Sequence, residues 1–314
     1  MVERMPIRIG TRGSKLARVQ AEEVINRLKA AHTALAGPEA LAVQIIRTTG
    51  DQVLDRPLAE LGGKGLFTKE IETALLAKEI DLAVHSMKDV PTWLPDGLVI
   101  AGCLPREDPR DAFISRRYGS FAGLPKGGVL ATSSLRRQAQ VLNRRSDLRI
   151  VPMRGNVGTR LRKLGEGEAD AILLAVAGLK RLNLAGHITT ALEPDEFLSA
   201  AGQGAIGVEC RADDDVLRTL LEPIFDAKTD RCLAAERAAL AALDGSCQTP
   251  IAVLAEIAGE DALFLRAMVA LPDGSLRYDV ERRGQVVDAE TLGKDAGEEL
   301  RSRAGPAFFA KLGG

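Results

Sequence analysis

Several basic side chains occur where a predicted strand ends and the next helix begins: Arg12, Lys64, Lys88, Arg136, Arg137, Arg154 and Arg160. Backbone N–H groups at such turns lack partners, and the helix dipole favours negative charge there. Arginine adds a planar fork that matches a carboxylate. Any one of these residues could be an ordinary surface cation. Their repetition at equivalent turns predicts a site for a ligand that carries several carboxylate or phosphate groups.

Asp89 and Cys247 are the candidate reactive residues. Asp89 follows a predicted strand, residues 81–85, and its carboxylate could stabilise a developing cation or move a proton. A role in capping a turn is an equal alternative. Cys247 lies in a polar turn, residues 244–250, where a thiol is more available for chemistry than in a core. The alternative for Cys247 is a small residue at a helix end.

Composition limits the classes of function. Lys and Arg number 42 against 43 Asp and Glu in 314 residues, and the net charge of -1 argues against a general nucleic-acid binder. No uncharged apolar run approaches the length of a membrane span. The four cysteines lack CxxC spacing and form no metal pattern with the histidines, of which His85 is predicted to be structural. We therefore expect a soluble cytoplasmic protein without a metal site or a membrane contact.

The residue pattern predicts two α/β lobes of one architecture. The expected strands are residues 7–11, 41–48 and 81–85, then 129–132, 148–153 and 170–177, and the expected helices are 15–31, 68–78, 134–145 and 157–164. This β-α-β-α-β order, which occurs twice, indicates mostly parallel sheets. Ligands of open α/β sheets bind beyond the carboxyl ends of the strands, where the basic residues lie. A ligand cleft between two lobes is therefore predicted.

Two further regions complete the chain. Residues 197–211 are predicted to return it to the first lobe through a strand at 205–210. Beyond residue 227, a helix that ends at 243, three strands and a final helix at 288–303 predict a small α+β domain. The glycines from Gly202 to Gly207 match GxGxxG, but they precede a strand instead of a helix, so no dinucleotide site is predicted.

A series of segments then identifies a family. They are IGTRGSKLA (9–17), GGKGLFTKEIE (62–72), DLAVHSMKDVP (81–91), ATSSLRRQAQ (131–140), RGNVGTRL (154–161), AGQGAIGVEC (201–210) and DGSCQTPI (244–251). In this order, from residue 7 to about 255, they closely resemble the porphobilinogen deaminase (hydroxymethylbilane synthase) family. The resemblance implies two α/β lobes like those of type II periplasmic binding proteins, with a cleft, and a small C-terminal α+β domain with a three-stranded antiparallel sheet. The implied domains are residues 1–104 with 203–224, 105–202, and 225–314.

The resemblance also implies an activity. The family joins four porphobilinogen molecules head to tail into hydroxymethylbilane, with release of ammonia, in tetrapyrrole and haem biosynthesis. The product grows on a dipyrromethane cofactor whose thioether maps to Cys247, and the catalytic aspartate maps to Asp89. The cofactor-binding residues map to Lys88, Ser86, Thr132, Ser134, Arg136, Arg137 and Arg160. The substrate-binding residues map to Arg12, Ser14, Lys64, Arg154 and Arg181, and the family implies a monomer.

Two other classes of function compete with this interpretation. A bilobal anion-binding protein without catalysis would share the lobes and the cationic cleft. The sequence shows no signal-peptide pattern for a periplasmic carrier, and such a protein would not require the Cys247 turn. A cysteine hydrolase would use Cys247 as its nucleophile, but the third predicted domain contains no histidine to act as the base.

Overall fold

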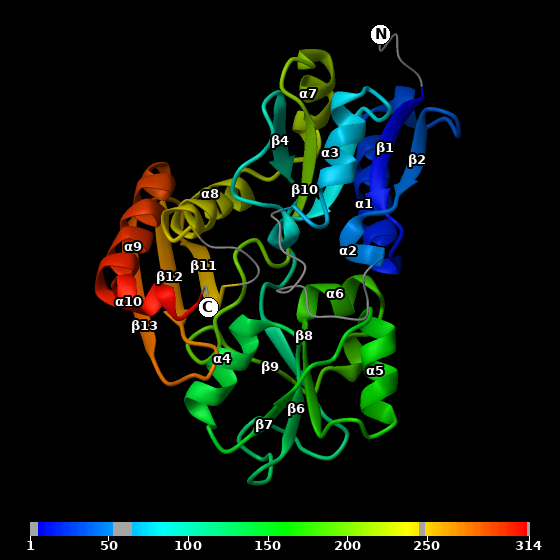
Figure 1. Cartoon of the computed structure of the whole chain (residues 1–314). Coiled ribbons are helices and arrows are strands. Elements are labelled where there is room, and N and C mark those ends of the chain that lie inside the picture. The colour runs from blue at the N-terminus through cyan, green and yellow to red at the C-terminus, as the bar shows by residue number, and fades with distance from the viewer. Residues whose placement is uncertain (1–5, 53–64, 245–248, 313–314) are drawn as a thin grey trace. The chain divides into compact units, whose positions relative to one another are not determined.

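The computed structural model describes residues 6–52, 65–244 and 249–312, so the predicted site residues Lys64 and Cys247 lie outside the described residues. The chain divides into two compact units (Figure 1). Unit 1 comprises Met1–Glu107 and Ala205–Asp230, and unit 2 comprises Asp108–Gly204 and Arg231–Gly314. The division into three domains stays a prediction. Within the described ranges, no helix combines the length and the apolar character that crossing a membrane requires.

Unit 1 contains a five-stranded sheet of order β2-β1-β3-β10-β4. Its strands are β1 (Ile7–Arg12), β2 (Leu41–Ile46), β3 (Leu82–Ser86), β4 (Leu98–Cys103) and β10 (Ile206–Arg211). The strand β1 is parallel to β2 and β3, whereas β10 is antiparallel to β3 and β4. The helices are α1 (Lys15–Ala31), α2 (Thr49–Gln52), α3 (Lys69–Leu76) and α7 (Asp215–Leu221), with 3-10 turns η1 (Thr33–Leu35), η3 (Met87–Asp89) and η5 (Glu222–Ile224).

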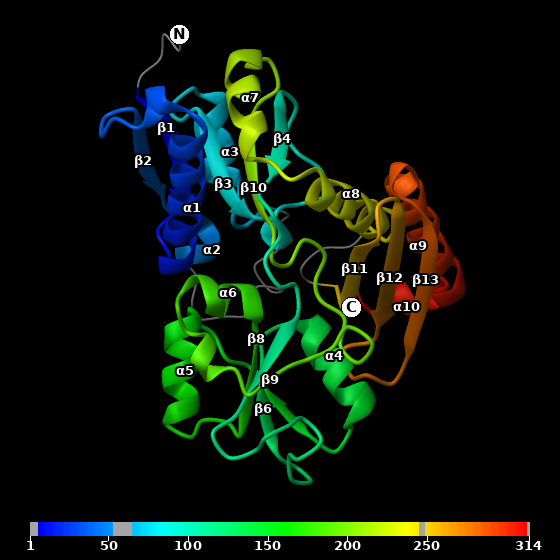
Figure 2. The same cartoon turned by 180° about the vertical axis from the view of Figure 1, so that it is seen from behind.

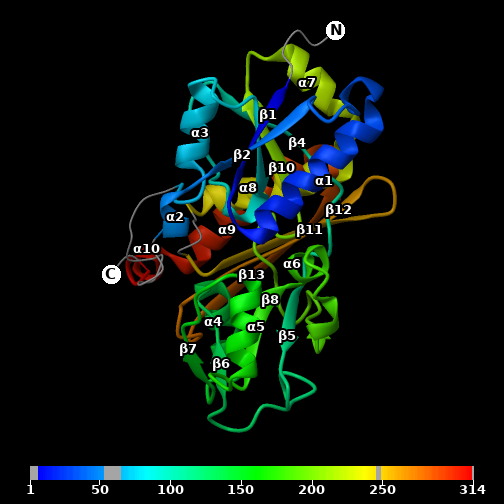
Figure 3. The ribbon, with the colours of Figure 1, turned by 90° about the vertical axis from the view of Figure 1, so that its right-hand side faces the viewer.

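Alternation along β3 determines which helix covers which face of this sheet. Leu82 and Val84 pack in one cluster with Val24 of α1, whereas Ala83 packs in another with Leu75 of α3. Because successive side chains of a strand point to opposite faces, α1 and α3 cover opposite sides of the sheet. Figure 3 shows the two helices on either side of the strands.

Unit 2 contains a second five-stranded sheet, of order β7-β6-β8-β5-β9, and a three-stranded antiparallel sheet, β11-β12-β13. The strands are β5 (Asp111–Ile114), β6 (Val129–Ala131), β7 (Arg149–Val151), β8 (Ala171–Ala175), β9 (Thr190–Ala191), β11 (Ile251–Ala258), β12 (Ala262–Ala270) and β13 (Arg277–Gln285). The helices and 3-10 turns are α4 (Leu135–Arg144), α5 (Val157–Gly165), α6 (Val176–Arg181), η4 (Ala185–His187), η6 (Val286–Asp288), α9 (Ala289–Ala304) and α10 (Pro306–Ala310). The helix α8 (Ala227–Ala242) begins in unit 1 and ends in unit 2.

The helices α4 and α5 cover opposite faces of the five-stranded sheet of unit 2 (Figure 2). Leu173 of β8 packs in a cluster with Val141 of α4, and the next residue, Leu174, packs with Leu164 of α5. This is the arrangement that alternation along the strand predicts.

The two five-stranded sheets share one topology, which confirms the predicted repeat. In each sheet, the first strand of the β-α-β-α-β repeat (β1 or β6) lies between the second and the third. An antiparallel strand (β10 or β5) pairs with the third strand, and one further strand (β4 or β9) forms the edge. The sheets are mixed, but only β10 in one and β5 in the other run against the remaining four strands, so the expectation of mostly parallel sheets is confirmed. The antiparallel strands β10 and β5 follow directly on the points where the chain passes from one unit to the other, so no helical crossover turns them into the parallel direction.

The predicted elements differ from the observed ones at short or fully apolar segments. The predicted strand 170–177 is divided into β8 and α6, because an uninterrupted apolar run does not distinguish a buried strand from a buried helix. The strands β4, β5 and β9 and the helices α2, α6, α7 and α10 have no counterpart among the predicted elements.

The three-stranded sheet forms the predicted small α+β region with α8 and α9. One of its faces packs Val253 and Leu265 against Ala235 of α8 and Ala296 of α9. The helices approach closely because Gly293 and Gly297 of α9 have no side chain. A Cβ at Gly297 would lie 2.6 Å from the carbonyl oxygen of Ala239, and one at Gly293 would overlap the carbonyl oxygen of Ala235.

We predict that Gly293→Ala lowers the free energy of unfolding by about 1–3 kcal/mol, because the added methyl must displace the backbone of α8. Urea-induced unfolding measures the change. Gly186→Ala is the matched control, since a Cβ at Gly186 meets nothing within 4 Å. Equal stability of the two variants would contradict the close approach of α8 and α9.

Candidate active site

A pocket in unit 1 lies at the carboxyl ends of β1 and β3. The residues that line it include the predicted site residues Arg12, Ser14, Ser86, Lys88 and Asp89. The parallel pairing of β1 with β3 brings these two strand ends together.

The two serines of the pocket are held by hydrogen bonds. Ser14 is the N-cap of α1 and accepts a hydrogen bond from the N–H of Ala17 at 3.2 Å. The Ser86 hydroxyl accepts a hydrogen bond from Nε2 of Gln20 at 2.8 Å. Gln20 belongs to the buried face of α1 and also lines the pocket. The hydroxyl groups at both strand ends therefore have defined positions.

Lys88 and Asp89 lie on the turn η3, which the buried Met87 anchors. The N–H of Met87 donates to the carbonyl oxygen of Ala205 at 3.1 Å. The strand β10 passes directly beneath the Met87 side chain, and a Cβ at Gly207 would overlap the Met87 sulfur. The glycine thus allows Met87 to fill the space, which fixes the two charged residues at the pocket.

Arg12 is held by several neighbours at once. Its Nε and Nη2 donate to the two carboxylate oxygens of Asp51 at 3.1 and 2.5 Å, and its guanidinium carbon lies 4.1 Å from the ring centroid of Phe67. Nη1 of Arg12 lies 3.5 Å from Oδ2 of Asp89. Burial lowers the pKa of Arg12, but the hydrogen bond with Asp51 and the charge of Asp89 outweigh it, so that pKa is raised. Burial raises the pKa of Asp51, but hydrogen bonds from Arg12 and Thr48 hold it below its usual range.

A buried acid–base pair adjoins the pocket. Nε2 of His85 lies 2.8 Å from Oε2 of Glu209, which joins β3 to β10 through their side chains. Burial raises the pKa of the nearby Glu72, and the charge of Glu209 raises it further. His85 therefore has a carboxylate partner. Among the residues that the structure describes, no three His, Cys, Asp or Glu side chains are placed to hold a metal ion.

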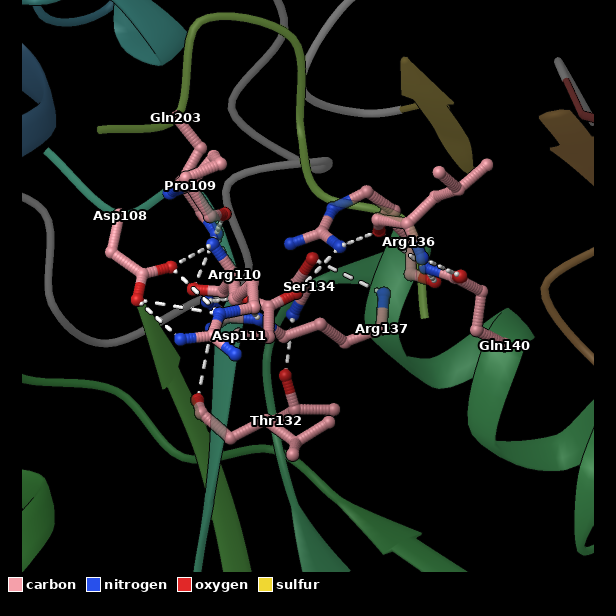
Figure 4. A network of polar contacts seen from close by, with 12 residues as sticks. Asp108, Pro109, Arg110, Asp111, Thr132, Ser134, Arg136, Arg137, Gln140 and Gln203 are labelled. Atoms are coloured by element: carbon pink, nitrogen blue, oxygen red, sulfur yellow. Dashed lines mark hydrogen bonds and ion pairs between the residues drawn. The ribbon is translucent and has the colours of Figure 1, made fainter. Parts of the chain in front are cut away.

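Arg136 and Arg137 form a buried ion triad with Asp111 in unit 2 (Figure 4). Asp111 is 0 % exposed and the two arginines are each 6 % exposed. The ion pairs are 2.7 and 2.6 Å long, and Nε2 of Gln203 donates to Oδ1 of Asp111 at 3.0 Å. Burial raises the pKa of Asp111, but the two guanidinium groups outweigh it and hold that pKa well below its usual range. Both predicted cofactor-binding arginines are therefore anchored inside unit 2.

The N-terminus of α4 carries the two predicted hydroxyl residues of unit 2. Ser134 is its N-cap and accepts from the N–H of Arg137 at 3.4 Å, and the Thr132 hydroxyl accepts from the N–H of Ser134 at 3.2 Å. This turn joins β6 to α4 in the way that the Ser14 turn joins β1 to α1. The two units therefore present a hydroxyl at equivalent positions.

Arg154 and Arg160 add positive charge near the same turn. Nε of Arg160 donates to the carbonyl oxygen of Gly155 at 2.8 Å. Burial lowers the pKa of Arg160 to about 10, and the charges of Arg137 and Arg154 contribute to this lowering. In the described part of the chain no carboxylate is among the groups that shift the pKa of Arg160. A bound anion would relieve the repulsion among these cations.

Arg181 is the remaining predicted residue that the structure describes. It ends α6, and its Nη2 donates to the carbonyl oxygen of Gly204 at 3.0 Å. The arrangement as a whole supplies cations and hydroxyl groups for carboxylates in both units. One carboxylate, that of Asp89, lines the pocket of unit 1 and could stabilise a positive charge there.

The sequence interpretation missed the residues that hold the predicted ones. Gln20, Asp51, Phe67 and Asp111 each contact a predicted site residue, and Gln203 contacts Asp111, but none of the five was assigned a role. The only available signal was the position of Asp51 directly after Gly50 at a strand end. The pairing of Asp111 with arginines 25 and 26 residues away has no local pattern.

Comparisons with known proteins agree over nearly the whole chain. Residues 7–219 match the family "Porphobilinogen deaminase, dipyromethane cofactor binding domain", and residues 231–302 match "Porphobilinogen deaminase, C-terminal domain". A porphobilinogen deaminase of Nitrobacter hamburgensis is 55% identical over 98% of this chain and 96% of its own length. That of Paracoccus denitrificans is 57% identical over 97% and 96%, and a chloroplastic one of Oryza sativa 52% over 98% and 86%.

Solved structures show a more distant likeness. A periplasmic substrate-binding protein of an ABC transporter from Coxiella burnetii superposes with a TM-score of 0.44 at 12% sequence identity. The likeness covers 71% of this chain and 93% of that one.

We predict that Asp111→Asn lowers the free energy of unfolding at pH 7 by about 3–5 kcal/mol, because two buried guanidinium groups lose their counterion. The folded-state pKa of Asp111 is lowered, so its contribution is present above its unfolded pKa of about 3.9 and is lost as the pH falls below that value. Urea unfolding between about pH 2.5 and 7 should therefore show a weaker acid dependence in the variant.

Asp147→Asn is the control for this experiment, because it removes a half-buried partner of Arg145 at the surface of the same unit. It should change stability at pH 7 much less than Asp111→Asn. The same acid dependence in Asp111→Asn and in the parent protein would contradict the assignment.

Proposed function

The chain belongs to the porphobilinogen deaminase family, and we propose that Asp89 is its catalytic carboxylate and Cys247 the anchor of its cofactor. It is a transferase of tetrapyrrole biosynthesis with a dipyrromethane-binding domain. The observation that carries the proposal is the pocket of unit 1, where Asp89 lies beside Lys88 and forms an ion pair with Arg12 at 3.5 Å. The alternative of an anion carrier without catalysis is not retained, because the curated relatives are deaminases at 52% identity or more.

Asp89 is placed to stabilise positive charge. When ammonia leaves the aminomethyl group of porphobilinogen, the remaining pyrrole carries a delocalised cation. A carboxylate about 4 Å away stabilises such a charge by about 4 kcal/mol at an effective dielectric of about 20. Asp89 lines the pocket, and its ion pair with Arg12, at 3.5 Å, is longer than the contacts of Arg12 with Asp51 at 3.1 and 2.5 Å. The same carboxylate can accept the proton that the attacking pyrrole α-carbon loses after it has formed the new bond.

The cations serve the carboxylates of the substrate. Each porphobilinogen carries an acetate and a propionate group, so successive condensations require several cationic contacts. The residues proposed for substrate are Arg12, Ser14, Lys64, Arg154 and Arg181. Arg12 supports this role most directly, since it lines the pocket and its Nη1 carries the ion contact with Asp89.

The residues of the chain also fit the cofactor. When bound, the dipyrromethane supplies a pyrrole α-carbon to which the first substrate is joined. Cys247 would hold it by a thioether, with Ser86 and Lys88 in unit 1 and Thr132, Ser134, Arg136, Arg137 and Arg160 in unit 2. The chemistry of the donor set supports the fit, because the lowered pKa of Arg160 marks a group of cations that an additional carboxylate would stabilise.

The other cysteines support Cys247 as the anchor. Cys103, Cys210 and Cys232 are 2%, 0% and 7% exposed, so an electrophilic pyrrole cannot reach them in the folded protein. Burial also raises the pKa of Cys210 to about 11, which disfavours its thiolate. A thiol that is alkylated once and then kept as a thioether need not be activated in every turnover. A cytoplasmic monomer stays part of the proposal, and analytical ultracentrifugation tests the oligomeric state.

We predict that the intact mass of the purified protein exceeds the mass of its sequence by two porphobilinogen units less two ammonia molecules. Cys247→Ser should fold and lack this increment, because a hydroxyl is a much weaker nucleophile than a thiol. Cys232→Ser, which changes a buried thiol, is the control and should keep the increment. An unmodified parent protein would contradict the anchor.

We predict that Asp89→Asn keeps the mass increment but lowers kcat about 100- to 1,000-fold, because an amide cannot supply the electrostatic stabilisation of a carboxylate. Steady-state formation of hydroxymethylbilane measures the loss. Asp96→Asn, which changes an exposed carboxylate of the same unit, should leave kcat unchanged. A near-normal kcat in Asp89→Asn would defeat the catalytic assignment.

A further inference from the structure

Asp51 contacts the pocket cation Arg12 but was not among the predicted site residues. Its two carboxylate oxygens accept from Nε and Nη2 of Arg12 at 3.1 and 2.5 Å. Oδ2 of Asp51 also accepts from the hydroxyl of the buried Thr48 at 2.9 Å, and the N–H of Asp51 donates to the Thr48 carbonyl oxygen at 3.0 Å. The carboxylate is therefore fixed at both its backbone and its side chain.

This contact uses one edge of the guanidinium group and leaves the other available. A guanidinium has five N–H groups, and a carboxylate on the Nε and Nη2 side occupies two of them. The second N–H of Nη2 and both N–H groups of Nη1 remain for another partner. Nη1 lies 3.5 Å from Asp89, and Arg12 lines the pocket. The remaining edge thus suits a ligand carboxylate next to Asp89.

The packing around Phe67 keeps this arrangement rigid. The Phe67 ring lies 4.1 Å from the guanidinium carbon of Arg12, and its edge lies against Gly50, where a Cβ would overlap the ring. The N–H of Gly50 donates to the carbonyl oxygen of Leu66 at 2.8 Å. The turn that carries Asp51 and the segment that carries Phe67 are therefore joined, and Arg12 is held between them.

The distribution of charge has a consequence for Asp89. Arg12 faces two carboxylates, and it makes the close, two-pronged contact with Asp51 while Asp89 stays 3.5 Å away. If Asp51 were neutral, Arg12 would be drawn toward Asp89. Closing that distance of 3.5 Å to about 2.8 Å favours the pair by about tenfold at an effective dielectric of about 20. The carboxylate of Asp89 would then be occupied by Arg12.

We propose that Asp51 is a positioning residue, which holds Arg12 by one edge so that the other edge can receive a substrate carboxylate and Asp89 stays available to the substrate cation. The inference rests on the proposed function of Arg12 and Asp89. Asp51 itself touches neither substrate nor cofactor in this scheme. It acts through Arg12.

Asp51→Asn tests the proposal, because an amide keeps the size of the side chain but loses the charge and one of the two accepting oxygens. We expect kcat/KM for porphobilinogen to fall about tenfold. In an Arg12→Gln background the same substitution should cause no further loss, since there is no guanidinium left to hold. Independently of turnover, 15N NMR should show faster exchange of the Arg12 Nε–H with water in Asp51→Asn than in the parent.

Asp81→Asn is the matched control. Asp81 makes the same two-pronged contact with Arg8 at the other end of β1, at 3.0 and 2.9 Å. Its loss should lower Tm and leave kcat/KM of the folded enzyme unchanged. If Asp51→Asn folds poorly, Phe67→Leu replaces it, since it removes the ring beneath the guanidinium and should lower kcat/KM in the same way.

Two results would overturn the proposal: parent-like kcat/KM in Asp51→Asn, or an equal additional loss in the Arg12→Gln background. The second would show that Asp51 acts on the fold and not through Arg12. A parent protein that forms no hydroxymethylbilane would contradict the proposed function instead. In that case unchanged Nε–H exchange in Asp51→Asn would still refute the hold on Arg12, and faster exchange would support it.

Discussion

Cations crowded at one end of a sheet repel one another, and this repulsion is the constraint on which the rest of the site depends. Carboxylates that differ in their burial offset this repulsion by forming ion pairs with some of the cations. Asp111 is 0 % exposed and forms ion pairs with two arginines, whereas Asp51 accepts hydrogen bonds from one edge of the pocket residue Arg12. Among the described residues no carboxylate contributes to the pKa shift of Arg160, and neighbouring cations help to lower that pKa. The position of each aspartate therefore determines which cations are held by an ion pair and which can bind a ligand carboxylate.

The repeated topology makes the two units comparable position by position. The turn after the first strand has a serine N-cap in both, Ser14 and Ser134. The turn after the second strand differs, because it carries the carboxylate of Asp51 in unit 1 and the amide of Asn156, an N-cap, in unit 2. A carboxylate at that turn can hold a cation, whereas an amide can cap a helix without adding charge. The same backbone thus supports two electrostatic environments.

The sequence predicts this protein well where structure is local. The helix expected at residues 15–31 is observed at Lys15–Ala31, because its apolar stripe and its N-cap serine are both encoded within one segment. The antiparallel strands β5 and β10 and the mixed sheets could not be obtained in the same way, since pairing direction depends on segments far apart in the chain. The site residues can be separated in the same way, into those that local sequence shows and those that it does not. Turn residues such as Arg12 are visible in sequence motifs, but their counterions Asp51 and Asp111 are set by tertiary contacts.

The order of strands in unit 1 has a consequence for how the chain is made. The edge strand β4 has β10 as its neighbour in the sheet, and β10 follows only after the chain has traversed residues 108–204 of unit 2. A nascent chain on the ribosome therefore holds Leu98–Cys103 without its partner strand until Arg211 has been added. Completion of the first sheet waits for synthesis of the second, so the two lobes cannot mature strictly one after the other.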